Sequence, residues 1–304
     1  MINIWQSLPK PIFCLAPMFG VTDSAFRQLL CELGRPDLMF TEFINVQAIF
    51  SPDIKTVTQL LSYTLQEQPL IAQLWGLDQE LFEAAADFIV HAGFQGIDIN
   101  MGCDAKTAVK KGAGGALIDN QDLAGKIIRS TIKGARGRLP VSVKTRLGFK
   151  TINTVPWFKF LLNFELAAIT IHCRTAKEMS LGPTHWNEIA KIVKLKNKYN
   201  PKTLIIGNGD IFTREIAYQR IKETKINGVM IGRGVFKTPW IFNSVPERNY
   251  SKAEKIAAWE RHLKIYQTTW GKTKPIHPLK RFLKVYLRGF PGALQMRTRL
   301  MDSL

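Results

Sequence analysis

Two stretches, IIGNGDI at residues 205–211 and GVMIGRG at residues 228–234, decide the fold. Each is a short apolar run that ends in glycines and a charged side chain, and such runs are typical of parallel strands buried on both faces. Glycines directly after a strand let backbone N–H groups approach an anion, and (β/α)8 barrels bind phosphate after their last two strands. The alternative is that the glycines only make tight turns. The residues that this pattern places at the phosphate site are Gly207, Asn208, Gly209 and Asp210 after the first run, and Gly232, Arg233 and Gly234 after the second.

Further apolar runs recur toward the N-terminus at nearly regular intervals. Together with the two above they predict strands at 12–16, 38–43, 69–75, 96–100, 140–146, 167–172, 203–207 and 228–232. Helix-period segments are expected at 23–33, 78–92, 122–133, 154–164, 186–198 and 214–225, whereas 45–67 shows no clear pattern. Eight strands that alternate with helices predict the α/β class and a (β/α)8 TIM barrel. An open, doubly wound sheet is the alternative.

The pattern changes after residue 243. The stretch NSVPERNYSK at 243–252 is typical of a linker, and helices are expected at 252–270, 278–288 and 293–301. We therefore expect two domains, a catalytic barrel over 1–243 and a small all-helical domain over 244–304.

Composition and charge narrow the function classes. The 304 residues include 46% hydrophobic residues, and Lys plus Arg number 42 against 24 Asp plus Glu, so the net charge is +18. The balance excludes a disordered or collagen-like chain, and no window reaches the ~18 apolar residues of a membrane span. The opening residues lack a secretory signal pattern, and the four cysteines form no CxxC pair, so we expect a reduced, cytoplasmic protein without disulfides. A monomer is our default expectation.

The basic charge is concentrated at the C-terminal end. Residues 244–304 hold 13 Lys and Arg against 4 Asp and Glu, a net charge of +9. Lys280, Lys284 and Arg288 are spaced to lie on one face of the helix expected at 278–288. Aromatic residues are interleaved with these cations. The pattern favours a nucleic-acid surface, with an ordinary solvated face as the alternative.

Polar or conformationally special residues follow every predicted strand, and in a barrel these positions meet at one face. Cys103 lies in such a loop, where it could be a nucleophile with His172 as its base, a proton donor, or an inert residue. Lys144 is on the inward phase of its strand, where a cation could stabilise negative charge on a cofactor or in a transition state; the alternative is an ion pair with Glu42 or Asp98.

His172 and Arg174 follow the sixth predicted strand in the sequence HCRT. A histidine paired with an arginine at a barrel mouth favours a functional role over a structural one. The five histidines show no metal-ligand spacing, so no metal is expected.

These motifs together resemble the flavin-dependent tRNA-dihydrouridine synthase family over nearly the whole chain. The matching stretches are LAPMFGVTD (15–23), TEF (41–43), AQLWG (72–76), DINMGCDAK (98–106), KKGAGGALI (110–118), PVSVKTRLG (140–148), IHCRT (171–175), IIGNGDI (205–211), GVMIGRG (228–234) and FLKVYLRGFPGAL (282–294). The NxGC element and the order of all the others make the resemblance specific.

The resemblance implies an FMN-dependent barrel, reduced by NADPH or NADH, that saturates the C5–C6 bond of a uridine in tRNA. It places Ala16, Pro17 and Met18 against the flavin ring, Gln73 at its pyrimidine edge, Lys144 near N1, His172 on the cofactor, and Asn208, Gly209, Asp210, Gly232 and Arg233 at its phosphate. It implies that Asn100 holds the uracil with Arg174 nearby, that Cys103 donates the proton to C5, and that the C-terminal helices bind tRNA.

Two residues depart from the family pattern. Asp104 stands where the family usually has proline after the catalytic cysteine, and Cys173 replaces the glycine of the usual HGRT. A carboxylate beside the thiol should raise the pKa of Cys103, which suits a proton donor. Two other functions remain open: an FMN barrel that acts on a free pyrimidine, and a tRNA-binding protein that has lost catalysis.

Overall fold

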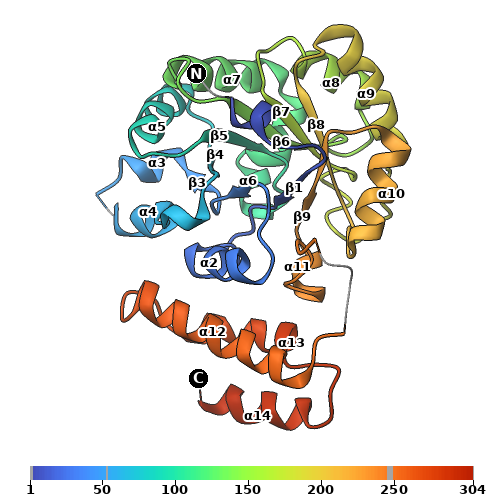
Figure 1. The fold of residues 1–304 in the computed structure, drawn as a ribbon. Helices are drawn as coiled ribbons and strands as arrows, with labels where there is room; N and C mark the ends of the chain where they lie inside the picture. Colours follow the sequence, from blue (N-terminus) through green and yellow to red (C-terminus); the bar gives the residue numbers. More distant parts are fainter. Residues whose placement is uncertain (1–2, 53, 245–248, 304) are drawn as a thin grey trace.

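The chain forms a closed parallel barrel with a helical unit packed below it, in a computed structural model that describes residues 3–52, 54–244 and 249–303 (Figure 1). The strands are β1 (Ile12–Leu15), β2 (Met39–Phe40), β3 (Ile44–Asn45), β4 (Leu70–Trp75), β5 (Gly96–Met101), β6 (Val141–Arg146), β7 (Ala168–His172), β8 (Leu204–Asn208) and β9 (Gly228–Ile231). They pair in the order β1-β9-β8-β7-β6-β5-β4-β2, and a parallel bridge between Cys14 and Leu38 closes the ring. The predicted TIM barrel is confirmed.

The second predicted strand, at 38–43, is interrupted, so that expectation was wrong in detail. Both pieces, β2 and β3, pair with β4. Between them, the N–H of Gln73 donates to the Thr41 hydroxyl at 3.0 Å, and the Glu42 carboxylate accepts from the N–H of Gly20. The Thr41 N–H still donates to the Ile71 carbonyl at 2.9 Å, so a side-chain hydroxyl replaces a strand carbonyl only at the next bond. Phe43, which follows, lines the cavity at the carboxyl ends of the strands.

The predicted helices surround the barrel close to their expected positions. They are α2 (Ser24–Leu33), α5 (Gln79–His91), α7 (Gln121–Gly134), α8 (Thr154–Leu161), α9 (Asn187–Tyr199) and α10 (Arg214–Thr224). The structure also contains elements that were not predicted: α1 (Ile4–Ser7), α6 (Lys106–Lys110), α11 (Gly234–Lys237) and the 3-10 turn η2 (Gly114–Asp119). Asp23, Asp78 and Thr213 cap their helices by accepting from backbone N–H groups in the first turn. The unassigned stretch 45–67 contains α3 (Val46–Ile49), α4 (Ile54–Leu61) and η1 (Leu65–Glu67).

The C-terminal residues form a helical unit against α2, with α12 (Lys252–Trp270), η3 (His277–Phe282), α13 (Leu283–Tyr286) and α14 (Ala293–Ser303) (Figure 1). Phe26 of α2 contacts Phe282 at a ring-centroid distance of 5.1 Å. Four residues of the expected linker, 245–248, lie outside the described residues. No helix in the described ranges is long and apolar enough to span a membrane.

The expectation of a single helix over 278–288 was wrong. A 3-10 turn gives way to one short α-helical turn, and Leu287 leaves helical geometry at φ −89° and ψ 71°. A 3-10 helix has about 3 residues per turn instead of 3.6, so Lys280, Lys284 and Arg288 do not share the face of one continuous α-helix.

One buried ion pair fixes the segment between β3 and β4 to the barrel. Arg27 and Glu67 are fully buried, and Arg27 Nε lies 2.7 Å from Glu67 Oε2. The other guanidinium nitrogens donate to the carbonyls of Thr22 and Ser62. Removal of the cation would leave a buried carboxylate without its charge partner.

We predict that Arg27→Met lowers the free energy of unfolding by about 3–5 kcal/mol, because breaking a buried pair leaves one charge uncompensated. The matched control is Arg261→Met. It breaks a partly exposed pair with Glu32 and should cost less than about 1 kcal/mol. Urea unfolding measures both changes, and equal losses would contradict the assignment.

Candidate active site

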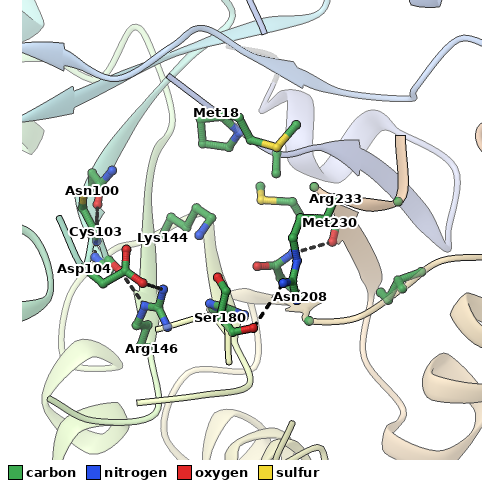
Figure 2. A pocket seen from close by; sticks show the side chains of 18 of the residues that line it. Met18, Asn100, Cys103, Asp104, Lys144, Arg146, Ser180, Asn208, Met230 and Arg233 are labelled. Carbon is green, nitrogen blue, oxygen red and sulfur yellow. Dashed lines mark hydrogen bonds and ion pairs between the residues drawn. The ribbon is translucent and has the colours of Figure 1, made fainter. Parts of the chain in front are cut away.

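The carboxyl ends of the strands surround a cavity of about 260 Å³ (Figure 2). The predicted residues that line it are Ala16, Pro17, Met18, Gln73, Asn100, Cys103, Lys144, His172, Asn208, Gly209, Asp210, Gly232 and Arg233. Phe43, Arg146, Ser180 and Met230 also line it without a predicted role in the site, as does Asp104, which was expected to raise the pKa of Cys103. Four predicted substrate-binding residues, Arg174, Lys280, Lys284 and Arg288, do not line this cavity.

A chain of hydrogen bonds leads from the barrel interior to the cavity. The buried Asp98 carboxylate accepts from Ser142 Oγ at 2.6 Å and from Gln73 Nε2 at 2.7 Å. Gln73 Oε1 then accepts from Asn100 Nδ2 at 3.0 Å. Strand register places these groups together, because Asp98 is the partner of Gln73 on one side and of Ser142 on the other.

The chain fixes which atoms Asn100 can offer to a ligand. Asn100 Oδ1 accepts from the N–H groups of Gly102 at 3.1 Å and Cys103 at 2.9 Å. Backbone N–H groups only donate, so the oxygen must face them and the NH2 group must face Gln73 and the cavity. One N–H of Asn100 remains for a ligand, and it selects a carbonyl oxygen over an amino group.

The Cys103 thiol lines the cavity in a form that favours proton donation. Burial raises its pKa most. The Ala105 N–H opposes this shift, the Asp104 carboxylate adds to it, and Lys144 and Arg146 oppose it with smaller effects. In the described part of the chain no hydrogen bond joins Cys103 to His172, whose pKa is lowered by burial and by four surrounding cations. The geometry therefore favours an acid over a nucleophile activated by histidine.

Arg146 holds the loop that carries Cys103. Its Nε donates to the carbonyl of Gly102 at 2.7 Å, and Nη2 pairs with Asp104 Oδ2 at 2.7 Å. Its Nη1 reaches the carbonyls of Thr175 and Met179, in the loop after β7. Asp104, at the position where the family pattern has proline, is therefore tied down by an ion pair.

Lys144 projects into the cavity from β6 (Figure 2). Burial and the neighbouring Arg146 lower its pKa to about 8, although Asp98 acts in the opposite direction. Neither of the ion pairs considered from sequence, with Glu42 or Asp98, is formed in the described residues, and the ammonium there makes no hydrogen bond. A half-buried cation without a partner can receive an anionic group of a ligand.

The opposite end of the cavity is organised around Asp210. Arg233 pairs with Asp210 and donates to the Ser180 carbonyl at 3.1 Å, while Arg174 pairs with Asp210 from the side away from the cavity at 2.5 Å. Although burial raises the pKa of Asp210, the hydrogen bonds from the two arginines lower it overall. Two cations against one carboxylate leave a net positive charge here. If a bound anion replaced Asp210 as the partner of Arg233, Arg174 would still neutralise the Asp210 carboxylate.

The remaining predicted cations lie elsewhere. Lys280 donates to the carbonyl of Met301, Lys284 is exposed, and Arg288 lines a separate groove with Trp240 and Tyr250. Among the residues that the structure describes, no group of three or more His, Cys, Asp or Glu is placed to hold a metal ion.

The fold and the cavity define a class: a (β/α)8 barrel with a protonated thiol of raised pKa and an unpartnered cation at the carboxyl ends of its strands. Solved structures of similar fold include morphinone reductase (TM-score 0.55, 11% identity, 82% of this chain and 90% of that one) and histamine dehydrogenase from Rhizobium sp. 4-9 (TM-score 0.57, 12% identity, 79% and 47%). At these identities the likeness concerns the fold alone.

Sequence comparison supplies the family. The model for dihydrouridine synthase (Dus) matches residues 14–303. A probable tRNA-dihydrouridine synthase of Staphylococcus aureus (strain COL) is 40% identical over 99% of this chain and 92% of its own length. Probable tRNA-dihydrouridine synthase 2 of Bacillus subtilis (strain 168) is 39% identical over the same shares. The chain belongs to the dihydrouridine synthase family of enzymes.

The buried Asp98 generates a prediction about stability and pH. Burial raises its pKa to about 6, above the usual 3.8, although Ser142, Gln73 and Lys144 oppose the shift. The group therefore favours the folded state most below about pH 4, and this contribution is lost as pH rises to about 6. The free energy of unfolding of the wild type, relative to Asp98→Asn, should fall over that window and be constant above it. Asp302→Asn controls for removal of an exposed charge, and a difference that rises with pH would refute the assignment.

The Asp104 carboxylate generates a second prediction. Because its charge raises the pKa of Cys103, Asp104→Asn should lower the pH midpoint for alkylation of that thiol by iodoacetamide, whereas Asp104→Glu should keep it near the wild-type value. The measurement uses a Cys31→Ser background, since Cys31 is the other cysteine that is not fully buried. An unchanged midpoint in Asp104→Asn would show that the carboxylate does not act on the thiol.

Proposed function

We propose that this protein reduces the C5–C6 bond of a uridine in tRNA to dihydrouridine, with FMN as its bound cofactor and NADPH or NADH as its reductant. The observation that carries the proposal is a thiol kept protonated, beside an amide N–H and an unpartnered ammonium, in the cavity of a dihydrouridine synthase family barrel. The names of the relatives supply the substrate class.

Several features of the cavity support FMN as the proposed cofactor. The ammonium of Lys144 can stabilise negative charge on the pyrimidine part of a flavin, and Gln73 offers an amide to its edge. A Cβ at Gly232 would lie 3.5 Å from Ala16 Cβ and Met18 Sδ, so the missing side chain leaves this wall open for a flat ring. Arg233, with Asn208, Gly209, Asp210 and Gly232, would hold the phosphate, and His172 would contact the cofactor. When bound, FMN supplies a hydride to C6 of the uracil.

The protein's own residues complete the reduction. Asn100 donates its remaining N–H to a uracil carbonyl and so holds the base in place. Cys103 gives its proton to C5, so that hydride and proton together add two hydrogens across the double bond. The resulting thiolate lies in the field of Lys144 and Arg146, which favour its charge until it takes a proton from solvent.

The tRNA is proposed to lie across the C-terminal unit. Its net charge of +9 favours a polyanion, and Lys280, Lys284 and Arg288 are proposed contacts on separate turns. Arg174 is paired with Asp210 in this structure, so a contact between it and the uracil stays a prediction that requires this pair to open. We further propose a cytoplasmic monomer that needs no metal.

The proton donor is tested with Cys103→Ala. Loss of a positioned general acid should lower kcat by about 10²–10⁴-fold, while bound flavin retains its absorbance. Mass spectrometry of digested tRNA, taken from a strain that lacks dihydrouridine, measures the gain of two hydrogens. Cys31→Ala is the matched control and should retain activity.

Other outcomes would replace the proposal. Turnover of free uracil or dihydroorotate without tRNA would indicate an enzyme of free pyrimidines. A wild type that binds tRNA and flavin but forms no dihydrouridine would indicate a binding protein that has lost catalysis. Full activity of Cys103→Ala would remove the thiol from the mechanism.

A further inference from the structure

Three aromatic side chains form a cluster at the mouth of the barrel, outside the reacting centre. Phe43 lines the cavity, and its ring centroid lies 5.4 Å from that of Phe19 and 6.4 Å from that of Trp75. Phe19 is 62% exposed, which is unusual for a ring of this size. The aromatic cluster of Phe19, Phe43 and Trp75 therefore leads from the cavity to solvent.

The exposed ring is held in place by its loop. The N–H of Gly20 donates to the Glu42 carboxylate, and its carbonyl accepts from Arg281 Nη1 at 2.8 Å. The N–H groups of Val21 and Thr22 both donate to the Met18 carbonyl at 3.0 Å. The loop is thus fixed on both sides of Phe19, so its ring stays exposed instead of folding back onto the core.

The surroundings of Phe19 suit a nucleic acid. A groove of about 230 Å³ runs from this ring to Lys274 and Arg281 of the basic C-terminal unit. The two carboxylates that line the same groove are engaged: Glu42 accepts from Gly20, and Asp23 accepts from Trp270 Nε1 at 2.8 Å and lies 3.5 Å from the Lys274 ammonium. Arg281, which is exposed, has only carbonyl partners among the described residues, so a phosphate of a bound RNA can meet its guanidinium while a base lies on the aromatic face.

We propose that Phe19, supported by Phe43, stacks an unpaired nucleobase of the RNA next to the uridine that enters the cavity. A uridine can reach the cavity only if it leaves the stack of its own strand, and this exposes the face of a neighbouring base. An aromatic ring at the mouth replaces the lost stacking partner without selecting among bases, since every base has a π-face. This inference rests on the proposed function and adds a subsite to it.

The test compares four variants in binding and in turnover with unmodified tRNA. Phe19→Ala and Phe19→Leu should each weaken tRNA binding and raise the KM for tRNA about tenfold or more, because neither side chain presents a π-face. Phe19→Trp keeps an aromatic face, so its tRNA affinity and its KM for tRNA should stay within about twofold of the wild-type values. Phe50→Ala removes another exposed ring, 49% exposed at the end of α3, and should change neither.

A second readout separates the subsite from the reaction with the reductant. Anaerobic reduction of the bound flavin by NADPH should proceed at the wild-type rate in Phe19→Ala. Wild-type tRNA binding in Phe19→Ala would overturn the proposal, as would wild-type binding in Phe19→Leu, which would show apolar contact instead of stacking. A slower flavin reduction with unchanged tRNA binding would assign the ring to the nicotinamide. If the wild type makes no dihydrouridine, the proposed function fails, and tRNA binding measured by anisotropy still decides the role of Phe19.

Discussion

The buried carboxylate of Asp98 is the group on which the geometry of the cavity depends. It accepts hydrogen bonds from two strands and so forces the Gln73 amide to turn its oxygen toward Asn100. Asn100 in turn holds the N–H groups of the loop that carries Cys103. A fully buried charge is costly. Here the Asp98 carboxylate and the side chains that link it to Asn100 all have hydrogen-bond partners, which offsets that cost. The orientation of Asn100, which lines the cavity, is thus set by Asp98 through two successive hydrogen bonds.

Charge is distributed across the cavity in a way that suits one anionic ligand and one neutral acid. Lys144 and Arg233 are two cations that line it, and of these two only Arg233 is already paired with a carboxylate. The Cys103 thiol, in the field of Lys144 and Arg146, is kept protonated by burial and by Asp104. The same Asp104 anchors the loop through Arg146, so this chain combines anchoring and pKa control in one residue where the family pattern has proline.

Sequence reasoning predicted the barrel because buried parallel strands are local apolar runs whose ends are marked by glycines and caps. It predicted thirteen of the cavity residues, since a barrel brings the carboxyl ends of its strands together. It did not predict the break at Thr41, where a hydroxyl replaces a strand carbonyl, or the 3-10 geometry before Leu283. The role of Asp98 depends on register between β4, β5 and β6, and the pairing of Arg174 depends on a loop 36 residues away. Neither the role of Asp98 nor the pairing of Arg174 can be predicted from the local sequence pattern.

The central claim is that uridine in tRNA is the electron acceptor of this barrel, and anaerobic reoxidation of the reduced, flavin-loaded protein tests it most directly. Stopped-flow absorbance would follow the flavin after mixing with tRNA from a strain that lacks dihydrouridine, and with tRNA whose target uridine is already reduced. The account predicts that only the unmodified tRNA reoxidises the flavin, with one dihydrouridine formed for each flavin oxidised. Equal reoxidation by both tRNAs, or by neither, would contradict it.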